Sequence, residues 1–124
     1  MLKLKTKWFN KWAKKNALPD HALLETLEAV TNNLNAVNLG SGLYKVRTLT
    51  AGQGKSGGFR TLLVYKNMDR AIFVYGFAKS DQGSLGAKDL EYLKKLAKDL
   101  LQLREIELVR QIKLGHFFNL VETK

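Results

Sequence analysis

The chain has 124 residues, of which 45% are hydrophobic and none is cysteine. This composition predicts one folded domain over residues 1–124, and it excludes disulfides, thiol catalysis and thiolate metal sites. The 21 lysines and arginines outnumber the 11 acidic residues, which gives a net charge of +10; such a field attracts polyanions, although a basic surface that only aids solubility is the plainer alternative.

The first elements in chain order read as a helical hairpin. Helical spacing of Trp8, Phe9, Trp12 and Ala13 predicts a basic amphipathic helix within residues 3 to about 16, and a strand-like start before this helix is left open. We expect both tryptophans to anchor the core rather than to stack on bases. A second helix is predicted from Pro19 to about residue 35, and the pair needs a sheet to cover its apolar faces.

The middle of the chain supplies that sheet. Residues 43–49, 59–66 and 71–79 are predicted strands, and the short polar turn at 67–69 makes the last two an antiparallel hairpin. Two C-terminal helices follow over 87–103 and 105–114, and the apolar tail is suited to add a strand or to meet a partner. The fold class is therefore α+β, with a small antiparallel sheet of three to four strands between an N-terminal helical hairpin and C-terminal helices.

Neither a secretory signal nor a membrane anchor is visible in the sequence. The N-terminal residues lack an apolar core of signal-peptide length, and no apolar run approaches the ~20 residues that span a bilayer. We expect a cytoplasmic protein without a membrane partner.

A glycine-rich loop, residues 52–58, precedes the second of these strands. Four of its seven residues are glycine, a residue kept where a ligand or another backbone comes close. The spacing of Gly52, Gly54 and Gly57 fits a dinucleotide-binding fingerprint, but a strand follows the loop where that fingerprint requires a helix. The same context argues against a P-loop, and the other elements of a protein kinase are absent. The loop is better suited to a different anionic ligand.

Basic residues gather at one edge of the predicted sheet. Arg60 and Lys79 lie at the strand ends far from the 67–69 turn, and Lys55 lies in the glycine-rich loop at this same end. Lys45 and Arg47, on the strand that enters the loop, are candidate neighbours. We expect these cations to converge and to bind phosphate.

Cations are also the candidate catalysts, because other chemistry finds little support in the sequence. His21 and His116 stand alone without a second metal ligand at a productive spacing, so neither a metal nor another cofactor is expected. RNA cleavage by its own 2′-hydroxyl needs a base, an acid and positive charge on the transition state. Arginine and lysine supply the last of these, which is usually the largest contribution.

Three segments resemble the RelE-type toxins of bacterial toxin–antitoxin modules, in particular the HigB-like branch. They are residues 42–47, the loop and strand start over 52–61, and residues 75–80. The resemblance implies a small antiparallel sheet flanked by helices. It also implies a ribosome-dependent endoribonuclease that cuts mRNA and is held inactive by a cognate antitoxin, often a helix-turn-helix protein.

The resemblance also assigns roles to single residues. Arg60 matches the strand arginine that acts on the scissile phosphate, Lys79 the basic residue after the last strand, and Lys55 a loop lysine that contacts RNA. Lys45 and Arg47 match further RNA-binding positions. The loop residues expected to let RNA approach closely are Gly54, Ser56 and Gly57. The family's C-terminal tyrosine or histidine has only His116 as a substitute here, since Tyr92 lies inside a predicted helix.

Two other functions remain open from the sequence. A ParE-type toxin of the same superfamily binds a topoisomerase and cuts nothing, and a non-catalytic nucleic-acid-binding domain needs only the basic surface. Replacing Arg60 or Lys79 distinguishes a nuclease from these two alternatives, because only in a nuclease should the replacement abolish toxicity while the fold stays intact.

Overall fold

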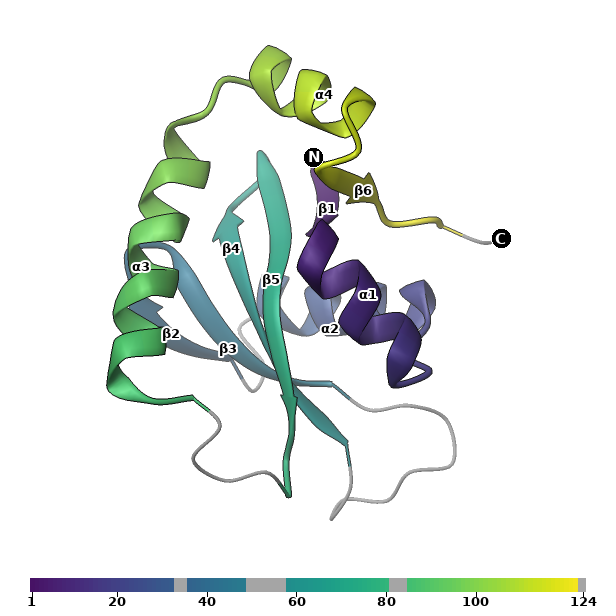
Figure 1. The fold of residues 1–124 in the computed structure, drawn as a ribbon, viewed down its shortest axis with the longest axis vertical. Coiled ribbons are helices and arrows are strands. Elements are labelled where there is room, and N and C mark those ends of the chain that lie inside the picture. The colour runs from purple at the N-terminus through teal and green to yellow at the C-terminus, as the bar shows by residue number, and fades with distance from the viewer. Residues whose placement is uncertain (33–35, 49–57, 81–84, 123–124) are drawn as a thin grey trace.

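The computed structural model describes residues 1–32, 36–48, 58–80 and 85–122. In chain order its elements are β1 (Leu2–Thr6), α1 (Lys7–Lys15), α2 (Asp20–Thr31), β2 (Ala36–Gly40), β3 (Leu43–Thr48), β4 (Phe59–Lys66), β5 (Arg70–Ala78), α3 (Ala87–Gln102), α4 (Glu105–Lys113) and β6 (Phe117–Asn119). Figure 1 shows the sheet between α3 on one side and α1 and α2 on the other. The α+β class is confirmed, and so are the N-terminal helical hairpin and the C-terminal helices.

The strands form one sheet in the order β2-β3-β4-β5-β1-β6. Its centre is the antiparallel set β3, β4 and β5, as predicted, whereas β1 runs parallel to β5. The hairpin between β4 and β5 is confirmed, and Met68 in its turn takes a φ of 62°. The ends of β3, β4 and β5 that carry the predicted cations therefore lie together, away from this turn.

Two apolar clusters hold the three layers together. The cluster on the α1 and α2 side includes Phe9 and Leu27, and the cluster on the α3 side includes Leu62, Leu93 and Ala97. Phe9, Leu62 and Ala97 are fully buried. Since each large apolar side chain contributes about 1.5–3 kcal/mol on burial, the sheet is a stable platform for the side chains at its open end.

The sheet has six strands within the described residues, so the predicted three to four was too few. β1 is one of the additions, and the first helix begins at Lys7 instead of residue 3. The hydroxyl of Thr6 caps that helix by accepting a hydrogen bond from the amide of Phe9 at 3.1 Å. Lys5 is buried in β1 because it pairs with Asp20 at 2.6 Å.

The other additions lie at the two edges of the sheet. α2 ends at Thr31, before the predicted end near residue 35, and β2 then pairs with β3. The C-terminal tail docks as β6 beside β1, one of the two outcomes expected for it. β6 depends on a partner far along the chain, β1, whereas β2 forms a hairpin with β3, the next strand in the chain.

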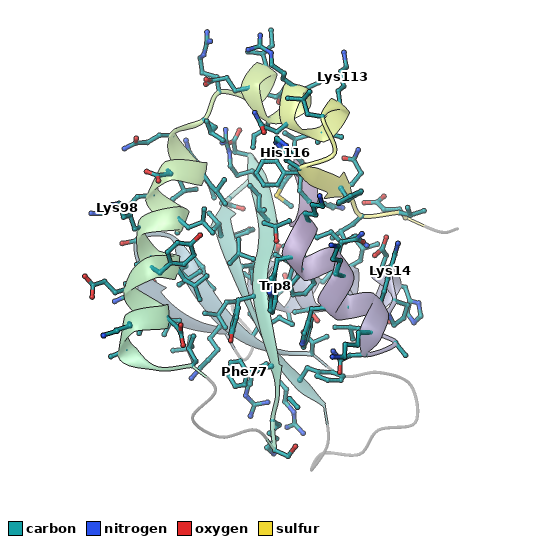
Figure 2. All side chains as sticks on the ribbon, viewed as in Figure 1. Trp8, Lys14, Phe77, Lys98, Lys113 and His116 are labelled. Carbon is teal, nitrogen blue, oxygen red and sulfur yellow. The ribbon has the colours of Figure 1, made fainter. Side chains whose placement is uncertain are left out.

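Trp8 was expected in the core, but its side chain is largely on the surface. It is 47% exposed, whereas Phe9 is fully buried. Its ring stacks on Tyr75 with centroids 4.8 Å apart and lies 6.3 Å from the ring of Trp12. Figure 2 shows Trp8 alongside β5, with Phe77 further along that strand.

Candidate functional site

Two arginines lie opposite each other on neighbouring strands, at the end of the sheet away from the β4–β5 turn. The register of β3 and β4 makes Arg47 the direct partner of Arg60. Successive strand residues point to opposite faces, so Arg60 shares the α3 face with Leu62, which packs in the α3-side cluster. Like charges directly opposite each other in a sheet are destabilising. This arginine pair is therefore costly to the fold unless an anion binds it.

The guanidinium groups of the pair contain nitrogens that are buried and unsatisfied. Nε and Nη2 of Arg47 and Nη1 of Arg60 have no hydrogen-bond partner among the described residues. Buried donors in native proteins are almost always paired, and an exception requires an explanation. Guanidinium groups bind phosphate through parallel N–H bonds. The unsatisfied donors make the arginine pair a candidate site for a phosphate group.

Two lysines extend the pair into a cationic row, defined here as Lys45, Arg47, Arg60 and Lys79. Lys45 is two residues before Arg47 and so lies on the same face of β3. The amide of Lys79 donates to the carbonyl of Gly58 at 3.2 Å, which fixes the end of β5 beside the start of β4. The predicted positions Lys55, Gly54, Ser56 and Gly57 lie outside the described residues.

A chain of threonine hydroxyls fixes the strands behind the arginine pair. Thr48 lies 2.9 Å from Thr26 of α2 and 3.0 Å from Thr61 of β4, oxygen to oxygen. Thr48 follows Arg47 and Thr61 follows Arg60, so the hydroxyls lie on the opposite face of the sheet. All three are nearly or fully buried. These bonds hold β3 and β4 in the register that puts the arginines opposite each other.

A β-bulge extends the face of the cationic row onto β5. Leu62 pairs with Tyr75, while Leu63 pairs with Phe73, so Val74 has no partner on β4. The extra residue turns Tyr75 to the same face as Val74, and Phe77 follows two residues later. Phe77 is the cross-strand partner of Arg60. An aromatic surface therefore adjoins the cationic row.

A comparison of the sequence with known protein families identifies the family of this chain. Residues 1–120 match the family described as the RelE toxin of the RelE / RelB toxin-antitoxin system. The chain belongs to the RelE toxin family. It is therefore the toxin of a toxin–antitoxin pair, and an antitoxin is its partner. The comparison with curated proteins found no match. The HigB-like branch stays a prediction.

The histidine considered as an acid for this toxin lies elsewhere. Nδ1 of His116 contacts Oε1 of Gln111 in α4. Figure 2 places His116 toward the α4 end of the molecule and Phe77 toward the end where β5 finishes. The structure does not bring His116 to the arginine pair.

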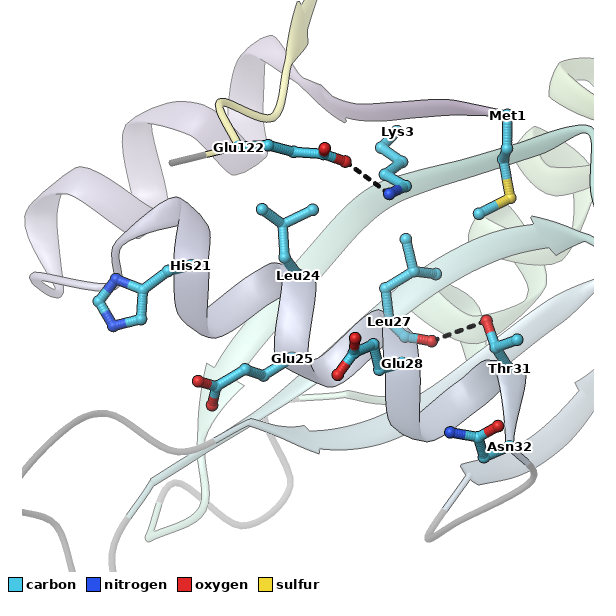
Figure 3. A pocket seen from close by; sticks show the side chains of 10 residues that line it. All are labelled: Met1, Lys3, His21, Leu24, Glu25, Leu27, Glu28, Thr31, Asn32 and Glu122. Carbon is cyan, nitrogen blue, oxygen red and sulfur yellow. Dashed lines mark hydrogen bonds and ion pairs between the residues drawn. The ribbon is translucent and has the colours of Figure 1, made fainter. Parts of the chain in front are cut away.

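A pocket of about 670 Å³ lies between α2, β1 and the C-terminal segment. Figure 3 shows Glu25 and Glu28 of α2 on its wall, with Glu122 paired to Lys3. The ion pair holds the pKa of Glu122 below its ordinary value. Three carboxylates against one lysine make this pocket unsuited to a phosphate group, so the cationic row is the better candidate for a phosphate site.

Among the residues that the structure describes, no three side chains of His, Asp or Glu lie close enough together to hold a metal ion. None of the described helices is long and apolar enough to cross a membrane.

Proposed function

We propose that this toxin is an mRNA interferase, an endoribonuclease that cuts mRNA on the ribosome without a metal ion and so inhibits translation. The observation that carries the proposal is the arginine pair. Arg47 and Arg60 are directly opposite each other and hold buried donors without a partner among the described residues. Phosphate is the ligand that satisfies both the charge and the donor geometry.

In the proposed reaction the 2′-hydroxyl oxygen attacks the adjacent phosphorus and the bond to the 5′-oxygen breaks. The hydroxyl proton passes to a base and the departing oxygen takes up a proton. Arg60 stabilises the negative charge that develops on the phosphoryl oxygens, while Lys79 and Lys55 position the phosphate. Arg47 and Lys45 bind the backbone of the RNA, as do Gly54, Ser56 and Gly57 in the loop.

The ribosome supplies positioning in this proposal. Holding the reacting atoms in line is worth many orders of magnitude in rate, and mRNA held by the ribosome has a fixed conformation. With the RNA positioned in this way, the main contribution required of the cations is stabilisation of the transition state. The proposed site of action is the cytoplasm.

The family match over residues 1–120 supports one toxin domain over 1–124. The cognate antitoxin is proposed to be a helix-turn-helix protein, which the resemblance to the HigB-like branch supports.

In-vitro translation tests the function directly. The partner-free toxin is added to a translation extract, and primer extension maps cuts in the mRNA with and without ribosomes. Wild type is expected to produce cuts only with ribosomes, and Arg60→Ala is expected to produce none. Arg110→Ala, which removes an exposed arginine of α4, is the matched control and keeps wild-type cutting.

Other outcomes identify the alternatives. Intact mRNA with unimpaired translation overturns the interferase proposal, and topoisomerase inhibition by the same preparation then indicates a ParE-type toxin. RNA binding that falls with salt but never leads to cleavage indicates a binding domain.

A further inference from the structure

A groove of about 350 Å³ lies between α3 and the aromatic surface of β5. Its walls include the rings of Trp8, Tyr75 and Tyr92 and the side chains of Leu93 and Leu96. Trp8 is 47% and Tyr92 66% exposed. Large aromatic side chains left exposed around a groove mark a binding surface.

Phe77 links the groove to the cationic row. The rings of Tyr75 and Phe77 are 6.3 Å apart, and Phe77 is the cross-strand partner of Arg60. The ring of Trp8 also stacks on Tyr75, with the two ring centroids 4.8 Å apart. A ligand whose phosphate lies on the arginine pair therefore has flat aromatic groups within reach along β5.

The lining of the groove selects a base over a phosphate. Among the described residues that line the groove, only Asp89, at the start of α3, is charged. Its carboxylate repels phosphate. Carboxylates can accept hydrogen bonds from N–H groups on a base edge, and one oxygen of Asp89 also accepts from the amide of Gly86 at 3.3 Å. Aromatic rings supply stacking surfaces that every base fits.

We propose that the groove formed by Trp8, Tyr75 and Tyr92 binds a base of the RNA whose phosphate lies on the arginine pair. This inference rests on the proposed function, because it takes RNA as the ligand of that pair. The base stacks against the aromatic set, with Asp89 at its edge. Stacking accounts for an exposed tryptophan in the first turn of α1, which burial does not.

The test measures binding of a short single-stranded RNA at low salt, with a second set of the same RNA made abasic at one position at a time. Trp8→Ala is expected to weaken binding of the intact RNA by about 5- to 100-fold. One abasic RNA should bind wild type as weakly as it binds Trp8→Ala, since the two losses remove the same contact. Trp8→Phe should retain most of the affinity.

Further variants test whether a loss of RNA binding arises from the groove. Tyr92→Ala, at a residue 66% exposed, is a second variant that does not disturb the core, and it should also weaken binding of intact RNA. Ile106→Ala removes an apolar side chain that is 60% exposed on α4 and should change nothing. Circular dichroism and the melting temperature confirm the fold of each variant.

The outcomes of these measurements distinguish failure of the base site from failure of the proposed function. If Arg60→Ala weakens RNA binding while Trp8→Ala and Tyr92→Ala do not, the base site is wrong and the phosphate site stands. If neither Arg60 nor Trp8 matters, or wild type fails to bind RNA, the base site is wrong, and cutting in the translation extract decides the proposed function separately. If Trp8→Ala weakens only the complex with the antitoxin, the groove belongs to the protein partner and the base site is wrong.

Discussion

Replacing Arg60 by methionine should make the toxin more stable and inactive. Methionine keeps most of the side-chain length but removes the charge opposite Arg47 and the unpaired donor Nη1. A buried unsatisfied donor costs about 1–3 kcal/mol, and a cross-strand like-charge pair adds about 0.2–1 kcal/mol. Because the Arg60 side chain is only part-buried, we expect a net gain of about 1–2 kcal/mol in the free energy of unfolding.

Thermal unfolding measures this gain. An unfolding entropy of about 2.1 cal/mol/K per residue over 124 residues amounts to about 0.26 kcal/mol/K. The melting temperature of Arg60→Met should therefore rise by about 4–8 °C. Inorganic phosphate should raise the melting temperature of wild type more than that of the variant, because binding to the folded state stabilises it.

Arg70→Met is the matched control, because that arginine is buried with its partners in place. Its guanidinium bonds to Asp69 at 2.7 Å and to the carbonyl of Leu100 at 2.8 Å, and it also bonds to the carbonyl of Leu103 at the end of α3. Loss of these bonds should lower the free energy of unfolding by about 2–4 kcal/mol. If Arg60→Met lowers the melting temperature as well, Arg60 has a structural partner and the reasoning is refuted.

Three further predictions concern the framework of the site. Thr48→Val removes the hydroxyl between Thr26 and Thr61 and should cost about 1–3 kcal/mol in urea unfolding. Thr48→Ser keeps the hydroxyl and loses only a buried methyl group, so it should cost less, about 1 kcal/mol; equal stabilities of the two variants would contradict the role of the hydroxyl chain. Gly76→Ala should cost about 1–3 kcal/mol and change the tryptophan fluorescence, because the added Cβ would lie 2.4 Å from the ring of Trp12; unchanged fluorescence and stability would count against this packing. The bond from Arg70 holds the pKa of Asp69 below its ordinary value of 3.8, so the stability that the ionised carboxylate adds is full above pH 3.8 and is lost as the pH falls through the lowered pKa. The gap in melting temperature between wild type and Asp69→Asn should therefore close in acid, and a gap independent of pH would refute this linkage.

The central hairpin and the position of the cations could be predicted from the sequence because local signals specify them. The turn at 67–69 joins two strands of strong β propensity, so Arg60 and Lys79 must lie at the same end whatever the register. The direct pairing of Arg47 with Arg60 requires the register of β3 and β4, which no turn signal gives because residues 49–58 separate the strands. Long-range contacts such as the threonine hydroxyl chain fix it.

The aromatic groove could not be predicted, because it depends on a bulge. Without the extra residue at Val74, alternation along β5 puts Tyr75 and Phe77 on the α1 and α2 side. Periodicity alone likewise puts Trp8 in the core beside Phe9, whereas its side chain is 47% exposed and stacks on Tyr75. The strand β1 did leave a signal, since Leu2 and Leu4 alternate with lysines, but the helical pattern that follows it obscured this period.

The rate of mRNA cleavage on ribosomes tests the central claim most directly. A single-turnover measurement compares wild type with Arg60→Ala, Arg60→Lys and the control Arg110→Ala. Loss of a preorganised donor at the transition state lowers a rate by about 10²–10³-fold, so Arg60→Ala should show this loss while Arg110→Ala cuts like wild type. Arg60→Lys should recover only part of the rate, because lysine keeps the charge but not the two-pronged geometry. Cleavage by Arg60→Ala at the wild-type rate would contradict the account.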